Sequence, residues 1–154
     1  MFTNPLPDDE LYLVHIAPYA QRHFIKHFEK DYPGKVWQVT LASIVEDLKR
    51  VRALCATDQV DELHHAGACW LFKYDFAIAL SHRSPKGSGN RCLVFLESET
   101  HQLHILLAYR KGDLPKGRSE TQYLEQVLRE EYQELVERLD TQGRRLTRRS
   151  RCDC

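Results

Sequence analysis

Four segments of the chain carry apolar residues in a pattern that is typical of β-strands. The clearest lies at 70–80, where every second position is apolar: Trp70, Phe72, Tyr74, Phe76, Ile78 and Leu80. A period of two over this length predicts a strand with one strongly buried face. Shorter apolar runs at 11–16, 92–96 and 103–109 predict three further strands. Short polar loops separate the last three of these four segments, which therefore predict an antiparallel meander.

Three other segments have apolar residues at helical spacing. Pro18 opens the first, which the sequence YPG at 32–34 ends, and the second covers about 41–51. The third follows Ser119 and Gln122, which have the spacing of a capping box. Its apolar positions recur every three to four residues and predict one long helix: Leu124, Leu128, Tyr132, Leu135 and Leu139.

The predicted order is β-α-α-β-β-β-α, with 55–68 as a polar connection between the second helix and the second strand. This order indicates an α+β fold, a small twisted sheet, antiparallel or mixed, with an N-terminal helical hairpin and a C-terminal helix packed on one of its faces. We expect one domain over 10–140. Residues 141–154 form a basic segment without apolar periodicity, and we expect it to be a disordered tail.

Composition narrows the class of protein. The chain has 154 residues, of which 42% are hydrophobic, and no apolar run is long enough to cross a membrane. The first residues lack the pattern of a signal peptide, and the five cysteines have no regular spacing, which favours reduced thiols and a cytoplasmic protein. The spacing of His23 and His27, one helical turn apart, would suit a metal, but two solvent-facing histidines beside Lys26 and Lys30 explain it better, and we expect no metal and no cofactor.

Charge is unevenly distributed although its total is zero. Residues 1–80 contain 8 Lys and Arg against 11 Asp and Glu, whereas residues 81–154 contain 14 against 11. The stretch SPKGSGNRCLVFL at 84–96 places a glycine-rich, basic loop directly before an apolar strand, with Arg91 at the junction. Backbone N–H groups in such a loop suit the approach of a phosphate, and a local basic field attracts a polyanion. A flexible hairpin loop with solubilising charges would give the same pattern.

The end of the next strand adds a second polar group, Tyr109, Arg110 and Lys111. In an antiparallel pair, the start of one strand lies beside the end of the other. We therefore expect Arg91 to lie near this group, which together would hold several cations and a phenol. Such a set is able to position a phosphodiester, stabilise charge in its transition state and move protons.

The segments GSGNRCLVF and HQLHILLAYRKGDLP, followed by a helix containing acidic residues, resemble the RelE/HigB-like toxins of type II toxin–antitoxin systems, within the RelE/ParE superfamily. The resemblance covers about 10–137 and is sharpest at 82–120. It implies a RelE-like fold and ribosome-dependent cleavage of mRNA, in which the ribose 2′-OH attacks the phosphate without a metal. It also implies contacts with rRNA and neutralisation by a cognate antitoxin.

The resemblance implies roles for individual residues. Arg91 would contact the scissile phosphate, and the terminal cluster Tyr109, Arg110 and Lys111 would supply proton transfer and charge stabilisation. The catalytic set also includes Lys86, and the RNA-binding set comprises His82, Arg83, Lys116 and Arg118.

This chain departs from the family at Asn90, where members often have an aromatic residue. Two other functions therefore stay open. One is a non-enzymatic module of the same fold that binds RNA or a protein, and the other is a ParE-like gyrase inhibitor.

Overall fold

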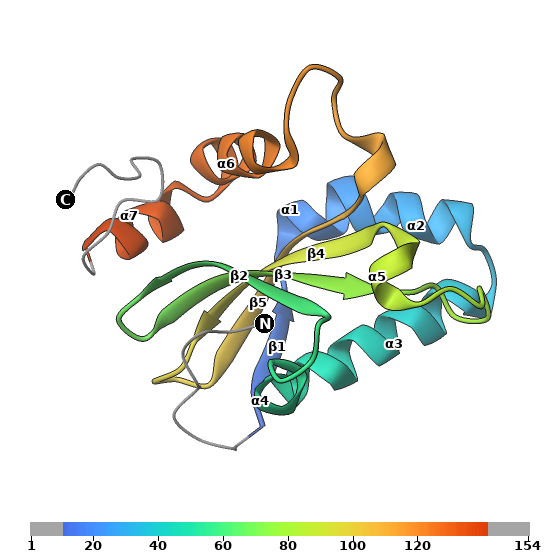
Figure 1. The fold of residues 1–154 in the computed structure, drawn as a ribbon, viewed down its shortest axis with the longest axis horizontal. Helices are drawn as coiled ribbons and strands as arrows, with labels where there is room; N and C mark the ends of the chain where they lie inside the picture. Colours follow the sequence, from blue (N-terminus) through green and yellow to red (C-terminus); the bar gives the residue numbers. More distant parts are fainter. Residues whose placement is uncertain (1–10, 142–154) are drawn as a thin grey trace.

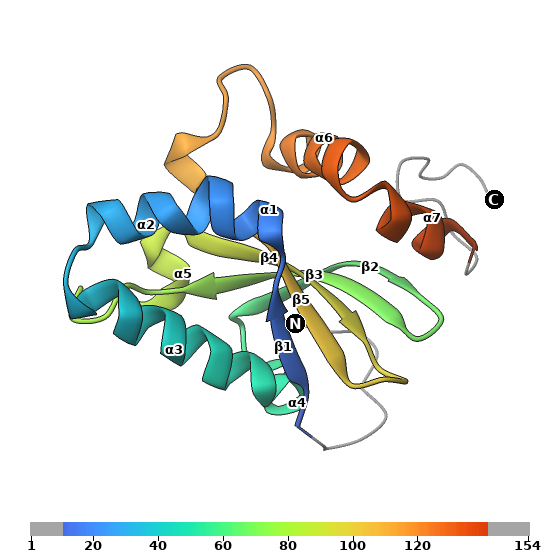
Figure 2. The same cartoon turned by 180° about the vertical axis from the view of Figure 1, so that it is seen from behind.

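The computed structural model describes residues 11–141, which form a five-stranded mixed sheet with helices on both faces (Figures 1 and 2). The strands lie in the order β1-β5-β4-β3-β2. The edge strand β1 (Leu13–Ile16) runs parallel to β5 (Gln102–Arg110), and all other neighbours are antiparallel. The remaining strands are β2 (Val60–Ala66), β3 (Cys69–Phe76) and β4 (Asn90–Glu97). The predicted α+β fold class and the meander of the later strands are confirmed.

The N-terminal helices cover one face of the sheet. They are α1 (Pro18–Ala20), a π-helical turn η1 (Gln21–Ile25), α2 (Lys26–Asp31), α3 (Lys35–Lys49) and α4 (Val51–Leu54). Phe28 from α2 stacks on Trp37 from α3, with ring centroids 4.9 Å apart, and both rings pack against Phe76 of β3. This face holds the larger part of the apolar core. The predicted helical hairpin is therefore present.

The other face is covered by α6 (Glu120–Glu131) and α7 (Gln133–Thr141) (Figure 1). Leu124, Leu128 and Leu139 pack there against apolar residues of β3, β4 and β5. The expectation of helices on one face was wrong, and β3, for which one strongly buried face was predicted, is buried on both faces. Because helices cover both faces, Leu71 is 1% exposed although it lies between the large residues of the alternating pattern.

The long C-terminal helix predicted from the sequence is interrupted at Tyr132, whose backbone leaves the helical region (φ −131°, ψ 42°). The Tyr132 hydroxyl donates a hydrogen bond of 2.6 Å to the carbonyl of Leu106 in β5. This bond ties the junction of α6 and α7 to the sheet. The capping box is confirmed, since Ser119 Oγ accepts from the Gln122 amide and Gln122 Oε1 accepts from the Ser119 amide.

Two further segments differ from the prediction. The polar connection contains the edge strand β2, whose alternation is broken by a bulge between Glu62 and His64. The predicted strand at 70–80 ends at Phe76, and Leu80 is 84% exposed with a positive φ.

The glycine-rich loop includes a short helix, α5 (Pro85–Ser88), which Ser84 caps, and η2 (Lys111–Asp113) follows β5. The basic tail at 142–154 lies outside the described residues. Within 11–141 no helix has the length and apolar character needed to cross a bilayer.

Candidate anion site beneath α6

A row of three polar side chains crosses the three central strands near the end of the sheet where β3 and β5 finish and β4 begins, on the face covered by α6. Strand pairing places Asp75 of β3 opposite Arg91 of β4, and Arg91 opposite Tyr109 of β5. Directly paired residues of neighbouring strands project from the same face of a sheet. All three side chains therefore lie on one face, where Arg91 Nε is 2.9 Å from Asp75 Oδ1. The structure brings together Arg91 and Tyr109, as expected from the sequence.

Glu120, the first residue of α6, meets this row from above. Arg91 Nη1 donates to both carboxylate oxygens of Glu120 at 2.6 Å, and the Tyr109 hydroxyl donates to Oε2 at 2.6 Å. Lys73 Nζ adds a fourth contact, 3.3 Å from Oε1. The capping box fixes where α6 begins, and a carboxylate in the first turn is stabilised by the helix dipole. Three donors from three strands thus converge on one carboxylate.

The protonation states of this cluster follow from its contacts. Burial raises the pKa of Glu120, but the hydrogen bonds from Tyr109 and Arg91 and the positive charge of Lys73 outweigh it and lower the pKa below 4.5. Burial, followed by the hydrogen bond to Glu120, raises the pKa of Tyr109, so the phenol keeps its proton. Burial also raises the pKa of Asp75, against the opposing effect of Arg91.

The cluster is shielded from solvent and electrically balanced. The side chains of Arg91, Glu120 and Lys73 are 13%, 16% and 17% exposed, and that of Asp75 is 5% exposed. With both carboxylates ionised, two cations face two anions. The arrangement is thus a neutral ion network between the sheet and α6.

The other members of the predicted catalytic set lie elsewhere. Arg110 follows Tyr109 in β5, and successive side chains of a strand point to opposite faces. Its guanidinium stacks over the Phe28 ring at 4.7 Å and pairs with Asp31 at 2.6 Å, on the face of the N-terminal helices. Lys86 of α5 reaches the Asp58 carbonyl at 3.3 Å. Lys111 is exposed at the end of the sheet where Arg91 lies, and its amide donates to the Gly89 carbonyl.

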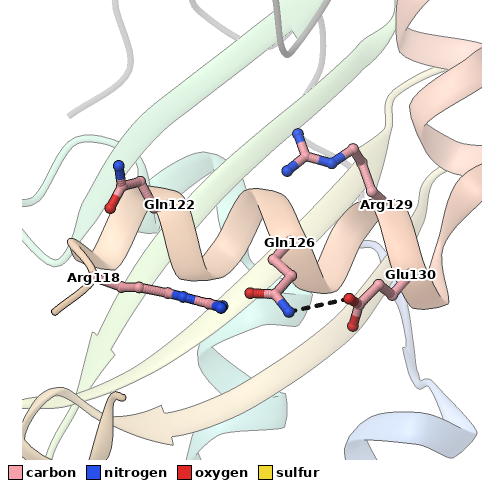
Figure 3. Close-up of a pocket in the computed structure, with 5 residues that line it drawn as sticks. All are labelled: Arg118, Gln122, Gln126, Arg129 and Glu130. Carbon is pink, nitrogen blue, oxygen red and sulfur yellow. Dashed lines mark hydrogen bonds between the residues drawn. The ribbon is translucent and has the colours of Figure 1, made fainter. Parts of the chain in front are cut away.

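The predicted RNA-binding residues are exposed on two loops. His82 and Arg83 lie between β3 and α5, and Lys116 and Arg118 lie between η2 and α6. Arg118 also lines an open groove of about 420 Å³ along α6, together with Gln122, Gln126, Arg129 and Glu130 (Figure 3). In this groove Gln126 donates to Glu130 at 3.0 Å. The groove presents two guanidinium groups and two amides on the solvent side of the helix that carries Glu120.

Sequence reasoning missed Lys73, Asp75 and Glu120. Lys73 and Asp75 are the charged residues between large apolar ones in the alternating pattern, which on a strand buried on both faces indicates a buried charge in need of a partner. Glu120 directly follows the N-cap residue that the capping box identifies.

Within residues 11–141, no three His, Cys, Asp or Glu side chains come together in a way that could hold a metal ion. The positions 23 and 27 belong to η1 and α2 and are exposed.

No family model matches the chain, and no curated protein matches it. In the comparison with solved structures, the chain is similar to a chain of the archaeal RelE–RelB complex from Pyrococcus horikoshii OT3. The TM-score is 0.45 at 13% sequence identity, and the alignment covers 68% of this chain and 99% of that chain.

Proposed function

We propose that this protein is a RelE-like toxin that cleaves mRNA on the ribosome, with Arg91 and Tyr109 at its catalytic centre. The observation that carries the proposal is the convergence of Arg91, Tyr109 and Lys73 on the two oxygens of one carboxylate. A phosphodiester likewise presents two non-bridging oxygens and one negative charge. Donors arranged for the carboxylate therefore suit the phosphate, and an arginine binds either group in the same two-pronged manner.

The chemistry assigned to these residues needs no metal. The ribose 2′-oxygen attacks the adjacent phosphorus and loses its proton to water, while the bond from phosphorus to the 5′-oxygen breaks. Arg91 stabilises the charge that develops on the phosphate oxygens. Tyr109, which keeps its proton because burial raises its pKa, gives that proton to the departing 5′-oxygen and regains one from water. The products are a 2′,3′-cyclic phosphate and a 5′-hydroxyl.

The exposed cations complete the proposal. Lys111, at the same end of the sheet, is available to approach the RNA and add to charge stabilisation. His82, Arg83, Lys116 and Arg118 lie on exposed loops, where they would contact the RNA backbone and supply a salt-dependent part of the affinity. Arg110 is better assigned to packing, because it pairs with Asp31 and covers Phe28 on the opposite face. Neutralisation by an antitoxin is part of this proposal.

One observation favours a second candidate, a binding module without nuclease activity. The positive charge of Arg91 is already paired with Glu120 and Asp75, so the role of the network is equally explained by the attachment of α6 to the sheet. In that case the fold would present its exposed basic loops to RNA or to a protein, and no bond would be cut.

Primer extension on an mRNA translated in a reconstituted system separates the two candidates. The nuclease should give discrete cuts within codons that require ribosomes, and both Tyr109→Phe and Arg91→Lys should reduce them strongly. Lys35→Ala, an exposed change at the start of α3, is the matched control and should cut as wild type does. Circular dichroism confirms that each variant is folded. An intact message with folded wild-type protein would exclude the nuclease.

A further inference from the structure

Glu120 occupies the position in which the proposed function needs a phosphate. Both of its oxygens are used, with Arg91 Nη1 on each, Tyr109 on Oε2 and Lys73 on Oε1. The side chains that would hold the phosphate are therefore already bonded to an anion that the chain itself supplies. Tyr109 is 4% exposed, and α6 separates it from solvent.

Charge balance makes the two occupants mutually exclusive. With Glu120 in place, Lys73 and Arg91 balance Asp75 and Glu120, and the network is neutral. A phosphate added beside Glu120 would leave a net charge of −1 in a shielded site, where repulsion between like charges is strong. If the phosphate replaces the Glu120 carboxylate, the sum stays at zero and the same donors stay bonded.

Most of the apolar attachment of α6 lies beyond its first turn, in which Tyr123 packs edge-on against Tyr109. The inward residues Leu124, Val127 and Leu128 pack on the sheet further along the helix, and Tyr132 holds its far end through the Leu106 carbonyl. The segment 114–119, which precedes Glu120, is mostly exposed. Glu120 is therefore held mainly by the ion network, whereas the rest of α6 is held by apolar packing.

We propose that Glu120 is an internal competitor for the phosphate, an autoinhibitory contact that closes the site until RNA displaces the first turn of α6. The inference rests on the site assigned under the proposed function. When the site must open before RNA binds, part of the binding free energy is used for that opening. The apparent affinity is then the intrinsic affinity multiplied by the fraction of molecules whose site is open. Removing the competing charge therefore strengthens RNA binding.

The test measures binding apart from cleavage. The probe is a short single-stranded RNA with a 2′-O-methyl group on every ribose, which cannot be cut by 2′-oxygen attack, and its Kd is measured by fluorescence anisotropy. Glu120→Gln should bind it about tenfold or more tightly than wild type. Glu125→Gln removes one negative charge from the same helix outside the network and is the control for a general charge effect. In Arg91→Ala/Glu120→Gln the gain should disappear.

Equal Kd values for folded wild type, Glu120→Gln and Glu125→Gln would overturn the inference, and so would an equal gain in the two single variants. Should Glu120→Gln fail to fold, hydrogen exchange of the wild type gives the answer. Saturating RNA should expose the amides of Gln122 and Tyr123, which bond to Ser119, whereas unchanged protection would overturn the inference. These results do not depend on the nuclease proposal, because the gain in RNA affinity is measured in the same way whether or not the protein cuts mRNA.

Discussion

The coupling between Arg91 and Glu120 is the contact on which the candidate site depends, and a double-mutant cycle measures it. At 2.6 Å and an effective dielectric constant of about 20, the attraction between the two charges is about 6 kcal/mol. The cost of removing each ion from water is several kcal/mol, and both side chains are less than one fifth exposed. We therefore expect a net coupling of about 2–3 kcal/mol.

The single change Arg91→Ala should cost more than the coupling alone. It leaves the carboxylates of Asp75 and Glu120 without their shared partner, with Lys73 still 3.3 Å from Glu120, so we expect a loss of about 3 kcal/mol in the free energy of unfolding. For a chain of this size that loss lowers Tm by about 10 °C. Adding Glu120→Ala to Arg91→Ala should cost less than Glu120→Ala costs in the wild type, because the carboxylate has already lost its main partner.

Urea unfolding followed by the fluorescence of the buried Trp37 and Trp70 provides the four free energies of the cycle. The pair Arg50 and Glu46 is the matched control, with a contact of 2.6 Å and side chains that are 58% and 55% exposed. Its coupling should stay below about 1 kcal/mol, as is usual for exposed pairs. A coupling below about 0.5 kcal/mol for Arg91 and Glu120 would refute the description of this network as the attachment of α6.

Three other changes test separate parts of the structure. Because its contacts lower the pKa of Glu120 below 4.5, its stabilisation is complete above that pH and is lost as the pH falls through the lowered value. Urea midpoints measured from about pH 6 down to 3 should therefore fall more steeply in wild type than in Glu120→Gln, and parallel curves would contradict the assignment. Ser119→Ala removes the cap of α6 and should cost about 1 kcal/mol in thermal unfolding, whereas Ser43→Ala, on the exposed side of α3, should change little. Tyr132→Phe loses the bond to the Leu106 carbonyl and leaves that buried acceptor unpaired, which should cost about 1–2 kcal/mol, and a neutral result in urea unfolding would show that the bond does not hold the junction.

Local rules in the sequence were sufficient for the parts of the fold that local physics decides. The capping box of α6 follows from two residues, and the meander from period-two alternation. The meander also places Arg91 beside Tyr109, because adjacent antiparallel strands bring the start of one to the end of the next. The strand β2 escaped detection since it lies at the edge of the sheet, is largely polar and is broken by a bulge at Leu63.

Which residues make up the site depends on contacts between segments that are far apart in the sequence. Arg110 was placed with Tyr109 because the two are neighbours in sequence, but neighbours on a strand point to opposite faces, and the rule of alternation alone would have separated them. The partner of Arg91 could not be predicted, because nothing in the local sequence indicates that α6 packs over the sheet with Glu120 above β4. The two buried charges of β3, Lys73 and Asp75, signalled only that some partner had to exist.

Stability and affinity together decide what the network is for. If Arg91, Tyr109 and Lys73 serve only to attach α6, then Glu120→Gln lowers the free energy of unfolding and leaves RNA affinity unchanged or weaker. If the same donors serve a phosphate, the variant loses stability and gains affinity, because the free energy that held the carboxylate becomes available to the RNA. The two quantities then change in opposite directions in one protein, which loss of structure by itself does not produce. A plot of Kd against unfolding free energy for wild type, Glu120→Gln and Glu125→Gln therefore distinguishes a network that only attaches α6 from one that also closes a phosphate site.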